Sequence, residues 1–272
     1  MNYWRNSILV LSILLGAAHP VSAQEASDLR LVPFPRQVQL ERATFKLDRP
    51  LVIDLPDETA TLLARMIVQE LARAGLPSPK LRTVDTDPNR LRLSVESPHQ
   101  EDEAPTTAFR EAATEEDYAL EIRPQQIVCT GHGQAGLYYG VQTLLQLIRA
   151  NRHDGGIPCL VIRDWPSLRW RCFQDDMTRG PSSTLETLKF EVATGAHLKM
   201  NLFTYYMEYQ YAFKKHPLIG PPDGSLEPRD LVALVEYAQP RHVDILGNQQ
   251  SFGHLRHVLK HDQYAHLREA PD

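Results

Sequence analysis

The sequence has only three cysteines, and they form no recognisable pattern. Cys129, Cys159 and Cys172 are widely spaced, without a Cys-x-x-Cys pair or a cluster of cysteine and histidine. An odd number at such spacings argues against a disulfide framework and against a zinc site. We expect three small residues buried in strands. The sequence offers no set of metal ligands, and we expect neither a metal nor another cofactor.

The sequence also lacks a strong excess of charge and, beyond its N-terminus, a long apolar run. The net charge is −5, which gives no electrostatic reason to expect nucleic acid or an anionic membrane as a partner. Hydrophobic residues make up 42% and charged residues 23% of the 272 residues. That composition is typical of folded proteins, and the length suits about two domains.

The first residues resemble a secretory signal peptide. Arg5 precedes a short apolar run from Ser7 to Ala18, and Val21-Ser22-Ala23 is a small-residue cleavage pattern. The run is shorter than the roughly 20 residues that a membrane-spanning helix needs. We therefore expect residues 1–23 to be removed and the protein to be exported to the periplasm or the extracellular space, with no membrane partner afterwards.

Residues 30–165 predict a compact α+β domain. Apolar spacing indicates helices over residues 58–74 and 134–150, the first capped by Asp57 and ended by Gly75. Alternation at Tyr118, Leu120 and Ile122 predicts one arm of a β-hairpin whose second arm is Ile127 to Cys129. Further short strands are expected at residues 31–33, 44–47, 51–55 and 91–95.

Residues 166–272 show a different order, in which strands and helices alternate. Strands are predicted at 171–177, 200–206 and 242–246, with a helix opened by the capping-box pattern Ser183 to Glu186 and another that begins at Pro228. Such an order favours parallel strands joined by crossover helices. Three units do not close a (β/α)₈ barrel, which needs eight strands.

A Gly-x-Gly-x-x-Gly sequence occupies residues 131–136, between a predicted strand and a predicted helix. That position could indicate dinucleotide binding. The required acidic residue would be Asp154, which lies in a loop before the next strand instead of at a strand end. The alternative is that these glycines turn the chain and allow close packing of the helix.

Four segments in order resemble glycoside hydrolase family 20, in particular its hexosaminidase D-like branch, and they extend over nearly all of residues 30–272. The motifs are Gly136 to Leu147; Ile157-Pro158, Ile162 to Pro166, Trp170-Arg171 and Asp176 to Gly180; Leu198 to Asn201 leading to Glu208; and Gln249 to Leu255 continuing to Tyr264 to Glu269. The resemblance implies an α+β N-terminal domain followed by the first three β/α units of an incomplete TIM (β/α)₈ barrel.

The resemblance also implies a function. Members of the family are exo-acting β-N-acetylhexosaminidases, whose nucleophile is the acetamido group of the substrate itself. The expected partner is a glycan or glycoconjugate with a terminal N-acetylhexosamine. In the family the acid/base glutamate and its aspartate neighbour follow the fourth barrel strand, which we expect beyond residue 272. This chain is therefore expected to be inactive alone; the alternative is a non-catalytic carbohydrate-binding or degenerate chain.

The resemblance leaves a supporting set of residues in this chain. Arg171 and Asp176 match substrate-binding or loop-fixing positions, and Glu208 and His254 match an acidic residue and a histidine that support the acid/base. We expect Arg171, Glu208 and His254 to converge at one end of the parallel strands. Cys172 and Tyr209 depart from the family pattern, which leaves substrate specificity open.

Overall fold

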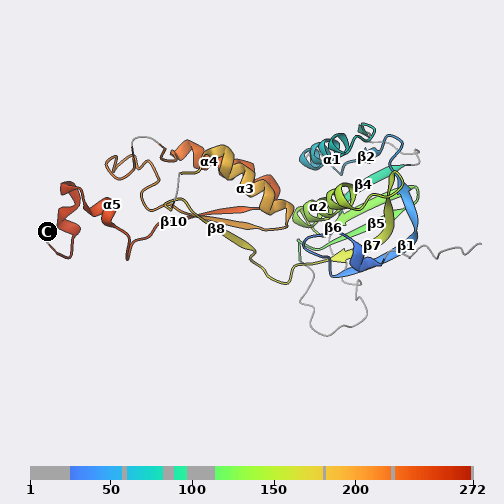
Figure 1. Ribbon diagram of the computed structural model, residues 1–272, viewed down its shortest axis with the longest axis horizontal. Helices are drawn as coiled ribbons and strands as arrows, with labels where there is room; N and C mark the ends of the chain where they lie inside the picture. The colour runs from blue at the N-terminus through green and yellow to red at the C-terminus, as the bar shows by residue number, and fades with distance from the viewer. Residues whose placement is uncertain are drawn as a thin grey trace, which may run out of the picture.

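The computed structural model describes residues 25–56, 60–81, 89–96, 114–179, 182–221 and 224–270. The predicted signal peptide and the predicted helix cap Asp57 lie outside these ranges. Among the described residues no helix is both long and apolar enough to cross a membrane. The chain forms two units that follow one another along the long axis of the molecule (Figure 1).

The first unit is built on a mixed sheet of seven strands in the order β1-β7-β5-β6-β4-β2-β3. The predicted hairpin is confirmed, since β5 and β6 pair antiparallel. β7 joins β5 and β1, also antiparallel, whereas β6, β4, β2 and β3 run parallel to one another. The strands are β1 (Gln37–Lys46), β2 (Val52–Asp54), β3 (Lys80–Leu81), β4 (Arg90–Val95), β5 (Tyr118–Arg123), β6 (Gln126–Gly131) and β7 (Gly156–Asp164).

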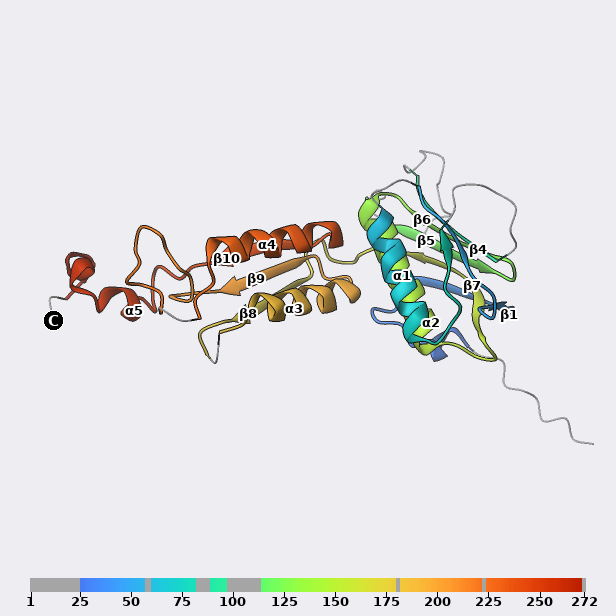
Figure 2. The ribbon, with the colours of Figure 1, turned by 90° about the horizontal axis from the view of Figure 1, so that it is seen from above.

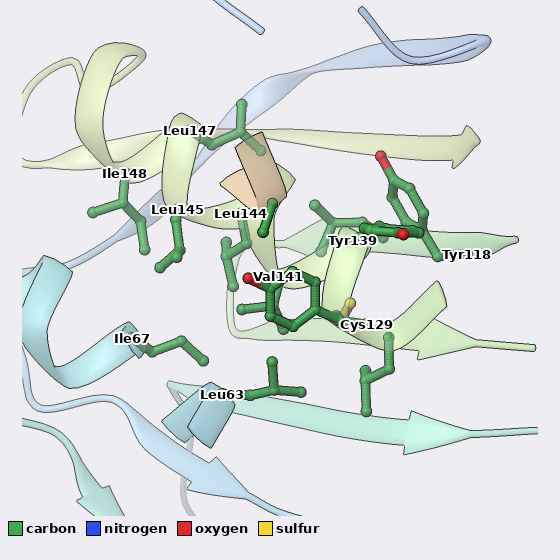
Figure 3. Close-up of a cluster of buried hydrophobic side chains, with 14 of the residues drawn as sticks. Leu63, Ile67, Tyr118, Cys129, Tyr139, Val141, Leu144, Leu145, Leu147 and Ile148 are labelled. Carbon is green, nitrogen blue, oxygen red and sulfur yellow. The ribbon is translucent and has the colours of Figure 1, made fainter. Parts of the chain in front are cut away.

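Two helices, α1 (Thr61–Arg73) and α2 (Gln134–Ala150), lie side by side on one face of this sheet (Figure 2). The sequence periodicity predicted both helices, and α2 has the predicted bounds. Helix α2 is buried from Gly136 to Ile148, because it packs on the strands on one side and on α1 on the other. Figure 3 shows this core, in which leucine and isoleucine side chains of both helices meet Tyr118 and Cys129 from the strands.

The glycines of residues 131–136 allow close packing. A β-carbon at Gly131 would collide with the backbone nitrogen of Leu137, and one at Gly136 would collide with the carbonyl oxygen of Asp117. The strand after α2 pairs antiparallel with both of its neighbours, unlike the parallel neighbour of a dinucleotide-binding unit. The geometry therefore favours the alternative that these glycines allow the helix to pack closely on the strands.

The second unit is a parallel sheet of three strands in the order β10-β9-β8. Helices α3 and α4 connect consecutive strands and lie on one face of the sheet (Figure 2). The elements are β8 (Cys172–Asp176), α3 (Leu185–His197), β9 (Leu202–Tyr206), α4 (Pro228–Ala238) and β10 (Asp244–Asn248). The alternation of strands and crossover helices predicted from the sequence is confirmed. A short helix, α5 (Arg256–Leu259), and a 3₁₀ helix, η4 (Asp262–Leu267), follow.

Three local predictions are corrected. Cys129 and Cys159 are buried in strands, but Cys172 is exposed, because it begins β8 at the edge of the small sheet. Helix α3 is capped by Thr184, whose side chain accepts a hydrogen bond from the amide of Thr187, and no capping box from Ser183 is present. The third strand begins two residues later than predicted, since His242 has a φ of 57°, which an extended strand does not allow.

Candidate functional site

The carboxyl ends of the three parallel strands lie in one row. Asp176 of β8 is in register with Tyr206 of β9, which is in register with Asn248 of β10. The pairing continues past the strands, because the amide of Met177 donates to the carbonyl of Tyr206 and that of Met207 donates to the carbonyl of Asn248. Side chains just beyond these ends are therefore held close together.

Glu208 is the buried carboxylate of this row. It lies two residues beyond β9, with a φ of 42°, and its side chain is 5% exposed. The hydroxyl of Tyr206 donates a hydrogen bond of 2.9 Å to its Oε1 atom. Burial and this contact with Glu208 raise the pKa of Tyr206, which keeps the phenol protonated and able to donate.

A guanidinium and an imidazole face the same oxygen of Glu208. A guanidinium nitrogen of Arg179, which follows β8, lies 3.5 Å from Oε1. Nδ1 of His254, which follows β10, lies 3.6 Å from it. The side chains of Arg179 and His254 are 55% and 54% exposed, so both remain open to solvent while they contact a buried carboxylate. The structure thus brings together Glu208 and His254, as expected.

Asp176 completes the cluster at the end of β8. Its carboxylate accepts hydrogen bonds from the amide and the hydroxyl of Thr178, at 2.9 and 2.7 Å. These bonds lower the pKa of Asp176, and the nearby charges of Arg179 and His254 act in the same direction. The carboxylate therefore stays ionised and shapes the turn that carries Arg179.

Arg171 is not part of this cluster, and the prediction that it converges with Glu208 and His254 is wrong. It precedes β8 and therefore lies at the amino ends of the strands. There its guanidinium forms a bidentate ion pair with Glu116, at 2.8 and 2.9 Å. The remaining donors bond the carbonyls of Lys199 and Leu168 and the hydroxyl of Tyr139.

All five N–H groups of the Arg171 guanidinium thus have protein acceptors. The sugar contact expected of Arg171 has no free donor in this structure. What the residue does instead is connect the two units, since Glu116 and Tyr139 belong to the first unit and Lys199 to the second.

A second buried contact joins the same two units. Lys199, at the turn before β9, places its Nζ atom 2.8 Å from a carboxylate oxygen of Asp164 and 2.8 Å from the hydroxyl of Tyr118. Tyr118 in turn bonds Asp164 and Thr143. Burial lowers the pKa of Lys199, and the charge of Asp164 opposes that effect.

Two residues of the cluster, Arg179 and Tyr206, were missed as site residues. Arg179 stands in the motif Asp176 to Gly180, and its spacing of three residues from Asp176 could have suggested a shared turn. Nothing in the sequence distinguished Tyr206 from an ordinary strand residue. Within the described ranges no group of three or more His, Cys, Asp or Glu side chains could hold a metal ion.

The arrangement combines a buried acceptor, a phenol donor, an imidazole and an exposed guanidinium. An imidazole next to a carboxylate can hold or pass a proton. A guanidinium fork that is half open to solvent can donate to hydroxyl or carbonyl oxygens of a polar ligand. The cluster therefore has the chemistry of a binding site for a polar, uncharged or weakly charged molecule, with a proton-holding network behind it.

Comparison with protein families finds a match to the first unit. The family described as glycosyl hydrolase family 20, domain 2, matches residues 28–165.

Among curated proteins, a beta-hexosaminidase of Porphyromonas gingivalis is 22% identical over 256 residues, which cover 85% of this chain and 31% of that protein. A beta-hexosaminidase of Vibrio furnissii is 24% identical over 208 residues, which cover 75% of this chain and 31% of that protein. The chain thus spans about a third of the length of the curated relatives it matches.

Solved structures show the same fold. A Flavobacterium johnsoniae chitobiase superposes with a TM-score of 0.70 at 19% identity, over 87% of this chain and 37% of that one. A β-N-acetylhexosaminidase from Streptomyces coelicolor A3(2) superposes with a TM-score of 0.68 at 21% identity, over 85% of this chain and 48% of that one. At such identities the likeness establishes the fold alone.

Proposed function

Because the chain belongs to glycosyl hydrolase family 20, we propose that it is part of an exported β-N-acetylhexosaminidase that acts on terminal N-acetylhexosamine residues of glycans. The names of the related beta-hexosaminidases support a hexosaminidase-like role. The first 23 residues, with the pattern of a signal peptide, support export.

We further propose that the second unit begins a (β/α)₈ barrel. Its three strands are parallel, adjacent and in sequence order, and each connection carries a helix. In such barrels the active site lies at the carboxyl ends of the strands. The cluster of Asp176, Arg179, Glu208 and His254 at those ends is the observation that carries the proposed function.

In this proposal the cluster binds and supports, and another carboxyl group performs the acid catalysis. Arg179 donates to sugar oxygens, while Glu208 orients Arg179 and, with His254, forms a proton-holding network beside the glycosidic oxygen. The nucleophile is the acetamido oxygen of the substrate. No Asp-Glu pair follows any of the three parallel strands, so we expect this chain to bind N-acetylhexosamine without cleaving it.

The test is calorimetric titration of the 272-residue chain with N-acetylglucosamine and with glucose. We expect a preference for N-acetylglucosamine and at least about a tenfold loss of affinity in Arg179→Met, the range for hydrogen bonds to a charged group. Arg229→Met is the matched control, because Arg229 at the start of α4 forms an exposed ion pair with Glu227, the residue that precedes the helix. Equal affinity for the two sugars, or an Arg179→Met variant that binds like the original, would refute the proposed site.

A further inference from the structure

A groove of about 410 Å³ lies on the loop that follows β9. Two aromatic side chains, Tyr211 and Phe213, line it together with the basic residues Lys214, Lys215 and His216 and the ring of Pro228. The two aromatic rings meet edge to face, with centroids 4.8 Å apart. The groove thus has an apolar wall and a basic rim.

The loop is held in place by two other segments of the chain. Tyr211 and Leu226 form an isolated parallel β-bridge, in which the amide of Ala212 donates a hydrogen bond to the carbonyl oxygen of Leu226. The C-terminal segment contributes Tyr264, whose hydroxyl lies 2.9 Å from Nδ1 of His216. Since the backbone and the imidazole are fixed by these bonds, a ligand would meet a largely formed surface and would need to order little of it.

The two lysines of the rim are exposed and carry no ion pair among the described residues. The protein as a whole is acidic, with a net charge of −5. Two adjacent uncompensated cations on such a protein, next to aromatic faces, form a local surface that attracts anions. An aromatic wall packs against the apolar face of a sugar ring, and an ammonium group pairs with a carboxylate or sulfate on that ring.

The groove and the candidate site share the segment that follows β9, since Glu208 and the residues from Tyr211 to His216 all lie on it. Lys214 follows Glu208 by six residues, so the two Cα atoms are at most about 20 Å apart along an extended chain. An oligosaccharide whose terminal residue occupies the cluster at Glu208 could therefore reach the groove with a later sugar.

We propose that this groove binds an anionic sugar, one that carries a carboxylate or a sulfate, in the part of the glycan beyond the terminal N-acetylhexosamine. The inference rests on the proposed function for the identity of that terminal sugar. It assigns Lys214 and Lys215 as the residues that select an acidic glycan over a neutral one, with Tyr211 and Phe213 as the packing surface.

The experiment measures dissociation constants of the 272-residue chain by calorimetry with four probes of similar length. They are a tetrasaccharide that alternates N-acetylglucosamine with glucuronate, a 6-O-sulfated N-acetylglucosamine tetrasaccharide, neutral N-acetylglucosamine tetrasaccharide, and a single-stranded oligonucleotide. The variant is Lys214→Gln with Lys215→Gln. The control, Lys46→Gln with Lys80→Gln, removes the same charge from the first unit. Circular dichroism melting verifies that both variants are folded.

We expect at least one anionic tetrasaccharide to bind about tenfold more tightly than the neutral one, the effect of two exposed ion pairs. The Lys214/Lys215 variant should lose that preference while its affinity for the neutral probe stays unchanged, and the control should keep it. Added salt should weaken the preference. The uronate and sulfate probes identify which anion is recognised.

The inference is overturned if no tetrasaccharide binds, if the neutral probe binds as tightly, or if the oligonucleotide binds as tightly. It is also overturned if the control variant loses the preference equally, because net charge and not the groove would then be responsible. Failure of the proposed function has a different signature. In that case monosaccharide N-acetylglucosamine shows no preference over glucose, whatever the effect of Lys214 and Lys215.

Discussion

Replacement of Lys199 by methionine should destabilise both units, because Lys199 carries the buried ion pair between them. The side chains of Lys199 and Asp164 are 7% and 11% exposed. Methionine keeps most of the aliphatic volume of lysine, so the variant mainly removes the charge. It leaves the carboxylate of Asp164 with the hydroxyl of Tyr118 and the amide of Arg36 as its hydrogen-bond donors.

Removal of one partner from a buried ion pair costs about 3–5 kcal/mol, since the other charge remains buried without compensation. We expect Lys199→Met to lower the free energy of unfolding by an amount in that range. The double variant Lys199→Met with Asp164→Asn should lose less than the sum of the two single variants, with a coupling energy of about 1–3 kcal/mol. Urea unfolding followed by tryptophan fluorescence measures this, since Trp165 and Trp170 lie on the segment between the two sheets.

Lys189→Met is the matched control. Lys189 forms an ion pair of 2.9 Å, close to the 2.8 Å of the Lys199–Asp164 pair, but its partner Glu186 is 81% exposed. An exposed pair contributes about 0–1 kcal/mol, so this variant should unfold at nearly the original urea concentration. If Lys199→Met cost less than about 1 kcal/mol, or no more than Lys189→Met, the argument that the junction depends on this buried pair would be wrong.

Three further outcomes are expected. Nε2 of His197 accepts a hydrogen bond from Arg149, since an arginine side chain only donates. Burial, and after it the charge of Arg149, lowers the pKa of His197 in the folded protein. The unfolded chain therefore binds the proton at a higher pH, and the free energy of unfolding should fall by at most about 1.4 kcal/mol per pH unit as the pH drops below about 6.5. His197→Asn should flatten that part of a pH series of urea midpoints, and an unchanged series would contradict the assignment. Gly136→Ala should lower the melting temperature by several degrees, because the added methyl group collides with the Asp117 carbonyl oxygen. Gly155→Ala is the control: no atom lies within 4 Å of the added methyl group, so any loss of stability there comes only from the φ of 73° at that position. The 272-residue chain should release no measurable p-nitrophenol from p-nitrophenyl N-acetylglucosaminide, and steady release would show that the catalytic carboxyl group is within it.

Local patterns in the sequence were sufficient for most elements of the fold. Helix α2 follows from apolar residues at helical spacing, and the β5–β6 hairpin follows from alternation around a short turn. Pro228 at the first position of α4 is a local signal of the same kind, because its ring suits the first helical turn and needs no amide donor there. These features depend on residues a few positions apart, so a sequence read alone reveals them. The order of strands and crossover helices after residue 166 followed in the same way.

The tertiary structure alone decided what the charged residues do. The motif around Arg171 was recognisable, but its partner Glu116 lies 55 positions away along the chain, in the loop before β5. Lys199 and Asp164 likewise meet across the junction of two units. Arg179 became a candidate only when the register of β8 with β9 placed it beside the buried Glu208. Periodicity reports which face of an element is apolar, whereas the end of the sheet at which a charge lies, and the partner that compensates it, depend on contacts between distant segments.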